Sequence, residues 1–415
     1  MPERSEWPGH GRLVHTASVA AIAVLLSTGK ADAQSAAAAP PPAPAAAPAP
    51  AQTSSLDVHA VSEFASYADT DHVFVETPSI AGAVSNPLTG WSVDGSYLVD
   101  VVSAASVDIV STASRRWEEV RQAGTLDAAY KPNDFGVSVA SALSVEPDYV
   151  SWMVGGSLTR DLLQKNLTLL LGYFHTNDTA GRTGTPFSVF SEQLDSEAFK
   201  AGATMVVNRT TTLAFIVDSI FENGNQAKPY RYIPLFAPGT SVPLGASIDL
   251  VNSIRESARP LERLPLSRQR YALSARLAHR FHRSTLRLDE RIYGDSWLLL
   301  ATTTDARYLF DLGPRVETGP HARLHVQNGV DFWERAYTLE PGFNDPEYRT
   351  GDRELGPLVN VTGGWSMKIG LGSRPNPTSW ILGFDANFTS TRFLDDLYVT
   401  QRASALVGVS LEANW

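Results

Sequence analysis

Arginine recurs at alternate positions in an extended segment whose other positions are mostly apolar. Arg268, Arg270, Arg276 and Arg280 share one side of the stretch 267–281, because side chains two residues apart on a strand point the same way. The following segments continue the pattern with Arg287, Asp289, Arg291, Asp305, Arg307, His321, Arg323 and His325. Guanidinium groups bind carboxylate and phosphate oxygens through several donors, so this set can select anionic solutes or hold a plug at a constriction. The alternative is a ladder of hydrogen-bonded charges that only stabilises a polar interior.

Three further acidic residues are placed by the same alternation. Asp94 and Asp100 lie opposite the side that carries valines 93, 99 and 101, so we expect them to face inward as partners for arginine rather than as catalytic groups. Glu290 falls instead on the apolar side of its segment. This exception predicts a bulge near Glu290 or a position at the rim.

Few residues in the chain have the types and spacing that metal binding or catalysis requires. His321 and His325 lie about 13 Å apart on a strand and cannot hold one metal ion without a bend. Asp345, Glu347 and Asp352 offer oxygen ligands that calcium prefers, but without a spaced loop motif the acidic residues are better explained as solvated loops. No Gly-x-Ser-x-Gly segment accompanies the many serines. We therefore predict no catalytic residues and no cofactor.

The elements that position these residues are strands, most clearly at the end of the chain. In the segment 405–415 the odd positions are apolar, including Val407, Val409, Leu411 and Trp415, while the even ones are mostly small or polar. Such a strand resembles the closing strand of bacterial outer-membrane β-barrels, whose terminal aromatic residue is part of the insertion signal. The expected partners are then outer-membrane lipid, lipopolysaccharide and the barrel-assembly machinery.

Connection lengths give an independent indication of the same architecture. Counting back from the last strand, one side receives short turns near 313–314, 282–284, 208–210, 164–166, 132–134 and 86–90, and near 374–377. The other side receives long connections at 331–356, 222–267 and 177–197. Outer-membrane barrels have short periplasmic turns and long outer loops. The predicted fold is therefore an all-β, antiparallel up-and-down transmembrane barrel of about 16 strands.

The expected strand 73–85 is interrupted by Pro78 and Gly82, two residue types that are unfavourable inside a strand. If it and a neighbour are not strands, the number falls to 14. A secreted β-sandwich or β-helix would also alternate, but it has no reason to sort its loops by side. No stretch after the N-terminal region approaches eighteen apolar residues, which excludes helical spans there.

The N-terminal region predicts export to the bacterial outer membrane. Arg4 and Arg12 precede an apolar run, and small residues follow, so we expect residues 1–33 to be a cleaved signal peptide. Residues 34–53 form an Ala/Pro-rich disordered tether that can reach a periplasmic partner. Residues 54–415 form a single barrel domain. The net charge of -10 argues against a nucleic-acid partner, and the chain contains 0 Cys.

Several segments resemble the recurring blocks of domain-of-unknown-function family 3570. They are the residues 97–108, 118–121, 146–151 and 289–297. The resemblance spans most of the mature chain. It implies an outer-membrane barrel of a Gram-negative bacterium, and it brings no established substrate, activity or catalytic residue.

Two classes of function are therefore expected. The first is a channel or porin-like conduit for small polar or anionic solutes through an arginine-rich lumen, which an inward fold of the loop 223–266 would favour. The alternative is a non-transporting barrel that anchors or assembles a periplasmic or cell-surface partner, which the tether favours. An outer-membrane hydrolase is a minor alternative.

Overall fold

The computed structural model describes residues 56–104, 117–340, 344–371 and 379–415. Sixteen antiparallel strands follow one another around a closed barrel in which β1 pairs with β18. The barrel strands are β1 (Asp57–Asp69), β2 (Val73–Asn86), β3 (Trp91–Ala104), β4 (Trp117–Tyr130), β5 (Phe135–Glu146), β6 (Tyr149–Leu162), β7 (Leu167–Ala180), β8 (Glu192–Asn208), β9 (Thr211–Gly224), β11 (Ser267–Arg280), β12 (Ser284–Asp295), β13 (Leu300–Asp311), β14 (Val316–Gln327), β16 (Leu358–Gly370), β17 (Ser379–Phe393) and β18 (Gln401–Asn414).

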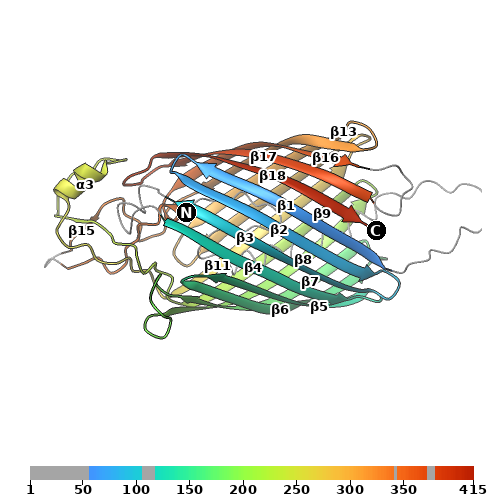
Figure 1. Ribbon diagram of the computed structural model, residues 1–415, viewed down its shortest axis with the longest axis horizontal. Coiled ribbons are helices and arrows are strands. Elements are labelled where there is room, and N and C mark those ends of the chain that lie inside the picture. Colours follow the sequence, from blue (N-terminus) through green and yellow to red (C-terminus); the bar gives the residue numbers. More distant parts are fainter. Residues whose placement is uncertain (1–55, 105–116, 341–343, 372–378) are drawn as a thin grey trace, which may run out of the picture.

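The connections are sorted by side, as the sequence predicts. One end, called here the loop end, carries the connections 225–266 and 328–357, and the other, called the turn end, carries tight turns such as 209–210 and 281–283. The two long loops contain β10 (Leu235–Phe236), α3 (Ile248–Ile254), β15 (Tyr337–Thr338) and the 3-10 helix η1 (Arg353–Leu355). Figure 1 shows α3 and β15 beyond the strands at one end of the barrel.

The outer face of the barrel exposes apolar side chains. Val139 is 61% exposed on β5 and Leu171 is 61% exposed on β7, whereas the inward Ala140 is 1% exposed. Two rows of aromatic contacts border this face. Near the loop end, Tyr173, Phe199, Phe221 and Tyr271 lie in contact across four strands, with ring centroids 5.2, 6.0 and 6.2 Å apart. At the turn end, contacts of 4.5, 6.2 and 4.8 Å join His279, Phe281, Tyr308 and Phe310.

The segment 73–85 is a true strand, so the 14-strand alternative is wrong. β2 pairs with β1 without interruption from Phe74 to Ser85, and Pro78 lies opposite Phe64. On the β3 side the pairing skips from Glu76 to Ser79, since proline has no N–H to donate to the ladder. One interrupted side is tolerated because the other neighbour holds the strand in register.

Some expectations are corrected by the structure. The connection predicted at 177–197 is shorter, because β7 continues to Ala180 and β8 starts at Glu192. These strands extend past the apolar band, where outward residues become polar and the alternation disappears. The expected bulge or rim position for Glu290 is also wrong. Glu290 is central in β12, and its register is unbroken against both β11 and β13.

The inner face is less uniformly polar than the alternation indicates. Ala140, Met153, Phe174, Ala198 and Ile220 form a buried apolar cluster on the inner side of β5–β9. The described part of the chain contains no helix long and apolar enough to cross a membrane. The predicted signal peptide 1–33, the tether 34–53 and the turn 374–377 lie outside the described residues.

Candidate functional site

The arginines of β11 all pair with a carboxylate from another strand of the barrel. Arg268 Nη2 lies 2.5 Å from Asp295 Oδ2, Arg270 Nε lies 3.0 Å from Glu222 Oε2, and Arg276 Nε lies 3.0 Å from Asp289 Oδ1. Arg280 pairs with Asp311 nearer the turn end. The structure thus brings the predicted arginines together as a column of ion pairs on one inner wall.

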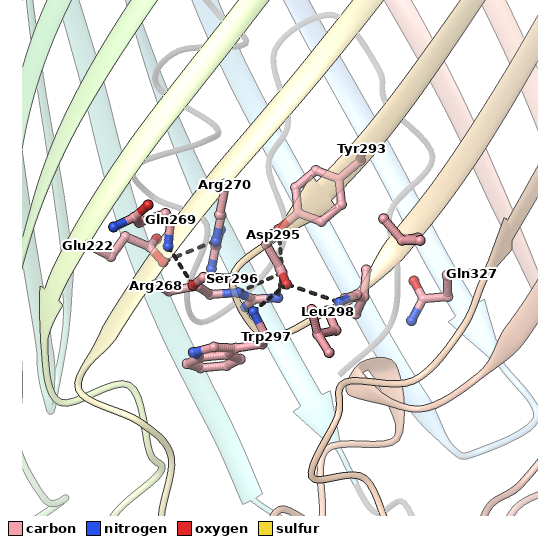
Figure 2. Close-up of polar contacts among 12 residues, drawn as sticks. Glu222, Arg268, Gln269, Arg270, Tyr293, Asp295, Ser296, Trp297, Leu298 and Gln327 are labelled. Carbon is pink, nitrogen blue, oxygen red and sulfur yellow. Dashed lines mark hydrogen bonds and ion pairs between the residues drawn. The ribbon is translucent and has the colours of Figure 1, made fainter.

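Asp295 is the centre of the group in this column that lies nearest the loop end (Figure 2). Its side chain is 0% exposed, and it accepts hydrogen bonds from Tyr293 Oη at 2.8 Å and from the backbone N–H of Trp297 at 2.9 Å. The guanidinium of Arg268 lies 4.2 Å from the Trp297 ring centroid. The connection 296–299 folds back because Asp295 caps its backbone. These contacts hold the inner wall of the barrel together near the loop end.

The middle of the inner wall is more accessible to solvent. The Arg276 and Asp289 side chains are 36% and 44% exposed. Arg287 lies directly opposite Arg307, and Asp289 lies opposite Asp305, on the paired strands β12 and β13. Arg291 faces the lumen one step nearer the loop end, and Arg323 lies opposite Asp305. The mid-barrel wall is therefore a wetted surface that carries more arginines than carboxylates among these positions.

The two histidines belong to separate hydrogen-bond networks. His321 contacts Asp305 Oδ2 and Asn387 Oδ1, each at 2.7 Å. His325 contacts Thr303 Oγ1 at 2.7 Å and Gln327 Oε1 at 3.1 Å. Each imidazole thus joins neighbouring strands of the wall.

The two inward aspartates of β3 differ in their surroundings. Asp100 is 0% exposed; it lies 2.8 Å from Arg121 and accepts a 2.5 Å hydrogen bond from Thr77. Asp94 lies instead opposite Asp127 on β4. The expectation of an arginine partner is therefore met by the position of Asp100, whereas Asp94 faces a second carboxylate. The difference depends on the register between β3 and β4, and the alternation of apolar and polar residues along one strand does not determine that register.

The long loops contact distant parts of the barrel rim. Tyr230 Oη contacts Asp148 in the turn between β5 and β6. Arg231 in the same loop lies 3.0 Å from Glu262 and 3.2 Å from Asp352. Arg402 on β18 lies 3.7 Å from Glu354 of the other long loop. The two loops are thus joined to each other and to the rim.

Two of the acidic residues considered for calcium pair with different arginines. Asp352 pairs with Arg231 and caps η1, while Asp345 lies 3.9 Å from Arg349. Glu347 lies between them in the same loop. The sequence did not single out Glu119, Glu146 and Asp148, whose carboxylate oxygens lie within 4.8 Å of one another in the described part of the chain. In the sequence, the only visible sign of this acidic group was the Glu-Pro-Asp turn at 146–148. Glu119 is distant from it in the chain and lies near it only because β4 pairs with β5.

Lys228, in the loop 225–266, is a cation beside the acidic group of Glu119, Glu146 and Asp148. Burial, and then the nearby Arg231, lower the pKa of Lys228 to about 8, while carboxylates that include Glu146 act in the opposite direction. Its backbone N–H also donates to Glu262 Oε2 at 2.9 Å. The loop therefore brings a titratable ammonium group into the acidic part of the rim.

A closed antiparallel barrel with an apolar outside, aromatic borders and a charged inside defines an outer-membrane β-barrel protein. The particular family follows from the sequence. The chain belongs to the family described as "Protein of unknown function (DUF3570)", whose model matches residues 78–376. The resemblance noted from the sequence is thus confirmed.

Several solved structures align with most of this chain at low sequence identity and low TM-score. Pseudomonas aeruginosa OprD is 9% identical with a TM-score of 0.41, over 86% of this chain and 94% of that one. Pseudomonas aeruginosa OccK7 (OpdD) is 11% identical with a TM-score of 0.40, over 87% and 98%. The siderophore receptor PirA from Pseudomonas aeruginosa is 11% identical with a TM-score of 0.41, over 86% of this chain and only 61% of the receptor. No curated protein matches the chain.

Proposed function

We propose that this protein is a porin-like conduit that carries small polar or anionic solutes across the bacterial outer membrane. The observation that carries the proposal is the solvent-accessible, arginine-rich wall in the middle of the lumen. Arg287 and Arg307 face each other across β12 and β13, and the Arg307 and Asp305 side chains are 29% and 21% exposed. Rings of basic side chains favour anions in aqueous pores. The proposal assigns no catalytic step to the protein.

The same proposal sets the orientation of the barrel. After removal of the signal peptide 1–33, the turn end faces the periplasm and the loop end faces the exterior, as is usual for outer-membrane barrels. The loops 225–266 and 328–357 then narrow the outer entrance. The wetted arginine wall lies behind them, where it meets a solute that has passed the loops.

Conductance of the purified protein in planar bilayers tests this function. We expect stable conductance steps and a reversal potential in a salt gradient that indicates anion preference. The double variant Arg287→Gln/Arg307→Gln should reduce that preference. Arg160→Gln is the matched control, because Arg160 is exposed on the outer face of β6 and should leave selectivity unchanged. Absence of stable conductance steps would contradict the proposal.

The buried contacts at the loop end favour one alternative, a non-transporting barrel that anchors a periplasmic or cell-surface partner. Arg353 and Asp71 have side chains that are 3% and 8% exposed, so the entrance is packed at that side. Crosslinking in whole cells from the tether 34–53 tests this alternative. Recovery of one periplasmic protein, together with a silent bilayer, would favour anchoring over conduction.

A further inference from the structure

Glu290 lies on the outside of the barrel at the middle of the membrane. On β11, Tyr271 belongs to the aromatic row near the loop end and His279 to the row at the turn end. These residues are about 27 Å apart along the strand, which at the usual tilt corresponds to about 20 Å of membrane thickness. Glu290 is paired with Ala275, which is halfway between them. A carboxyl group therefore lies near the membrane midplane.

The contacts of Glu290 confirm that it faces outward. Thr302 Oγ1 donates to Glu290 Oε1, and Thr304 Oγ1 donates to Oε2, each at 2.6 Å. On the same face of β12, Leu288 is 37% exposed and Ile292 is 58% exposed. The polar group is thus surrounded by lipid-facing apolar side chains. A charged or polar group in this position is costly in hydrocarbon, and intramembrane ionisable residues usually have a functional partner.

Lipid does not supply that partner. Headgroups and the cations bound to them lie at the interfaces, about 12 Å from the midplane of a band about 25 Å tall. Acyl chains offer no hydrogen-bond donor or acceptor. Beyond the Thr302 and Thr304 hydroxyl groups of its own wall, the remaining source of polar atoms at this depth is the surface of another protein molecule.

We propose that the outer face of β11–β14 around Glu290 is an interface with a second copy of this chain. Two copies inserted in the same direction are related by a two-fold axis along the membrane normal, which brings equal depths together. Each Glu290 then meets the carboxyl and hydroxyl groups around the other Glu290. The Thr302 and Thr304 hydroxyl groups of each copy lie at the same depth and add hydrogen-bonding groups to the contact.

The shape and charge of the outer face favour this symmetric contact. Ala275 is paired with Glu290, and Ala306 and Ala322 follow in outward positions on the next strands, β13 and β14. Small side chains let two walls approach closely in a membrane. On the described strands, the outward-facing arginines Arg160 and Arg392 lie close to strand ends. A non-symmetric contact between copies would therefore bring no guanidinium to the depth of Glu290.

Thiol crosslinking in native outer membranes tests the interface, because the chain has 0 Cys of its own. Ala275→Cys keeps Glu290 in place and should give a product of twice the chain mass with a short bifunctional thiol reagent. Val139→Cys is the control, since Val139 is an outward-facing aliphatic residue that is 61% exposed on the distant strand β5. We expect roughly tenfold more dimer from Ala275→Cys than from the control.

The variant Glu290→Leu, combined with Ala275→Cys, separates the interface from folding. Leucine suits a lipid-facing position, so the barrel should still fold and keep its heat-modifiable migration on gels. We expect the dimer yield to fall roughly tenfold. An unchanged yield, equal yields from Ala275→Cys and Val139→Cys, or a product whose mass indicates a different protein would each overturn the proposal. None of these readouts depends on conductance.

Discussion

Arg353 Nη2 lies 2.8 Å from Asp71 Oδ2, which ties the loop 328–357 to the turn between β1 and β2. Both side chains are almost completely buried, and the Arg353 guanidinium also lies 5.1 Å from the Phe393 ring centroid. This pair joins residues 282 positions apart in the chain. It holds a long loop against the part of the rim where the barrel closes.

Replacing Arg353 by Met should loosen this loop. Removal of one partner leaves a buried carboxylate without a compensating charge. In comparable pairs this lowers the stability of the folded state by about 3–5 kcal/mol. We expect much faster proteolytic cleavage within 328–357 and larger conductance steps, with partial recovery in Asp71→Asn/Arg353→Met. The control is Arg335→Met, because Arg335 and Asp395 lie 2.6 Å apart but are 33% and 39% exposed, and such exposed pairs contribute little. Equal cleavage rates in both single variants would refute the role of the buried pair.

Arg121→Met should destabilise the barrel itself. Arg121 is the charged partner of Asp100, which is fully buried and otherwise holds Thr77. We expect the free energy of unfolding to fall by about 3–5 kcal/mol. This should be seen as a lower temperature for the change from folded to unfolded migration on gels. Asp100→Asn/Arg121→Met should recover part of the loss. Lys368→Met serves for comparison, since Lys368 is 52% exposed in its pair with Glu412 and its removal should matter far less.

Lys228 should make the packing of the loop 225–266 depend on pH. Its pKa is lowered from 10.5 to about 8 by burial, so the packed loop binds this proton less tightly than the released loop does. The packed state is disfavoured below pH 8 and gains stability as pH rises toward 10.5, by about 3 kcal/mol in total. Burial and the contact with Asp148 raise the pKa of Tyr230, so that phenol loses its proton at a higher pH than an exposed tyrosine does.

Limited proteolysis of the loop at pH 7 and pH 10 measures this effect. Lys228→Met is the reference at each pH, because any pH dependence of the protease cancels in the ratio of cleavage rates. We expect the natural protein to be cleaved faster than Lys228→Met at pH 7 and at a similar rate at pH 10. A ratio that does not change with pH would show that Lys228 does not control the loop.

Gly155→Ala should impair folding of the inner wall. A methyl group at Gly155 would lie 2.5 Å from the Tyr173 carbonyl oxygen and would also meet the Phe174 ring. Overpacking of this kind typically costs about 1–3 kcal/mol. Gly363→Ala is the matched control, because no heavy atom lies within 4 Å of that added carbon. The yield of folded barrel in membranes should fall for Gly155→Ala only.

The sequence predicted the architecture well because lipid and lumen impose opposite preferences on alternate residues. The prediction of sixteen strands is confirmed, including β2 despite Pro78. The extended ends of β7 and β8 were missed because Asn177 and Asp195 lie beyond the apolar band and hydrogen-bond to each other at 2.9 Å. Outside the membrane, a strand needs no lipid-facing stripe, and its pattern is no longer distinctive.

The sequence predicted which residues line the candidate site, but it did not predict most of their partners. Alternation placed the β11 arginines on the inner face, yet the partners Glu222 and Asp311 depend on register with other strands. Asp94 shows the same limit, because only the β3–β4 register places it opposite Asp127. Loop contacts such as Tyr230 with Asp148 arise from residues 82 positions apart and leave no local pattern.

The pairing of β1 with β18 has a consequence for assembly. This seam joins Asp69 to Ser404 and His59 to Asn414, and a side-chain contact across it spans 333 positions in the chain. All other barrel pairings join strands that are neighbours in chain order. Closing so long a loop is entropically expensive and slow, so hairpins can form early while the two seam strands keep unpaired edges. Those edges are prone to pair with other chains, and the time before the β1–β18 seam closes is therefore the period in which this chain is most prone to aggregate.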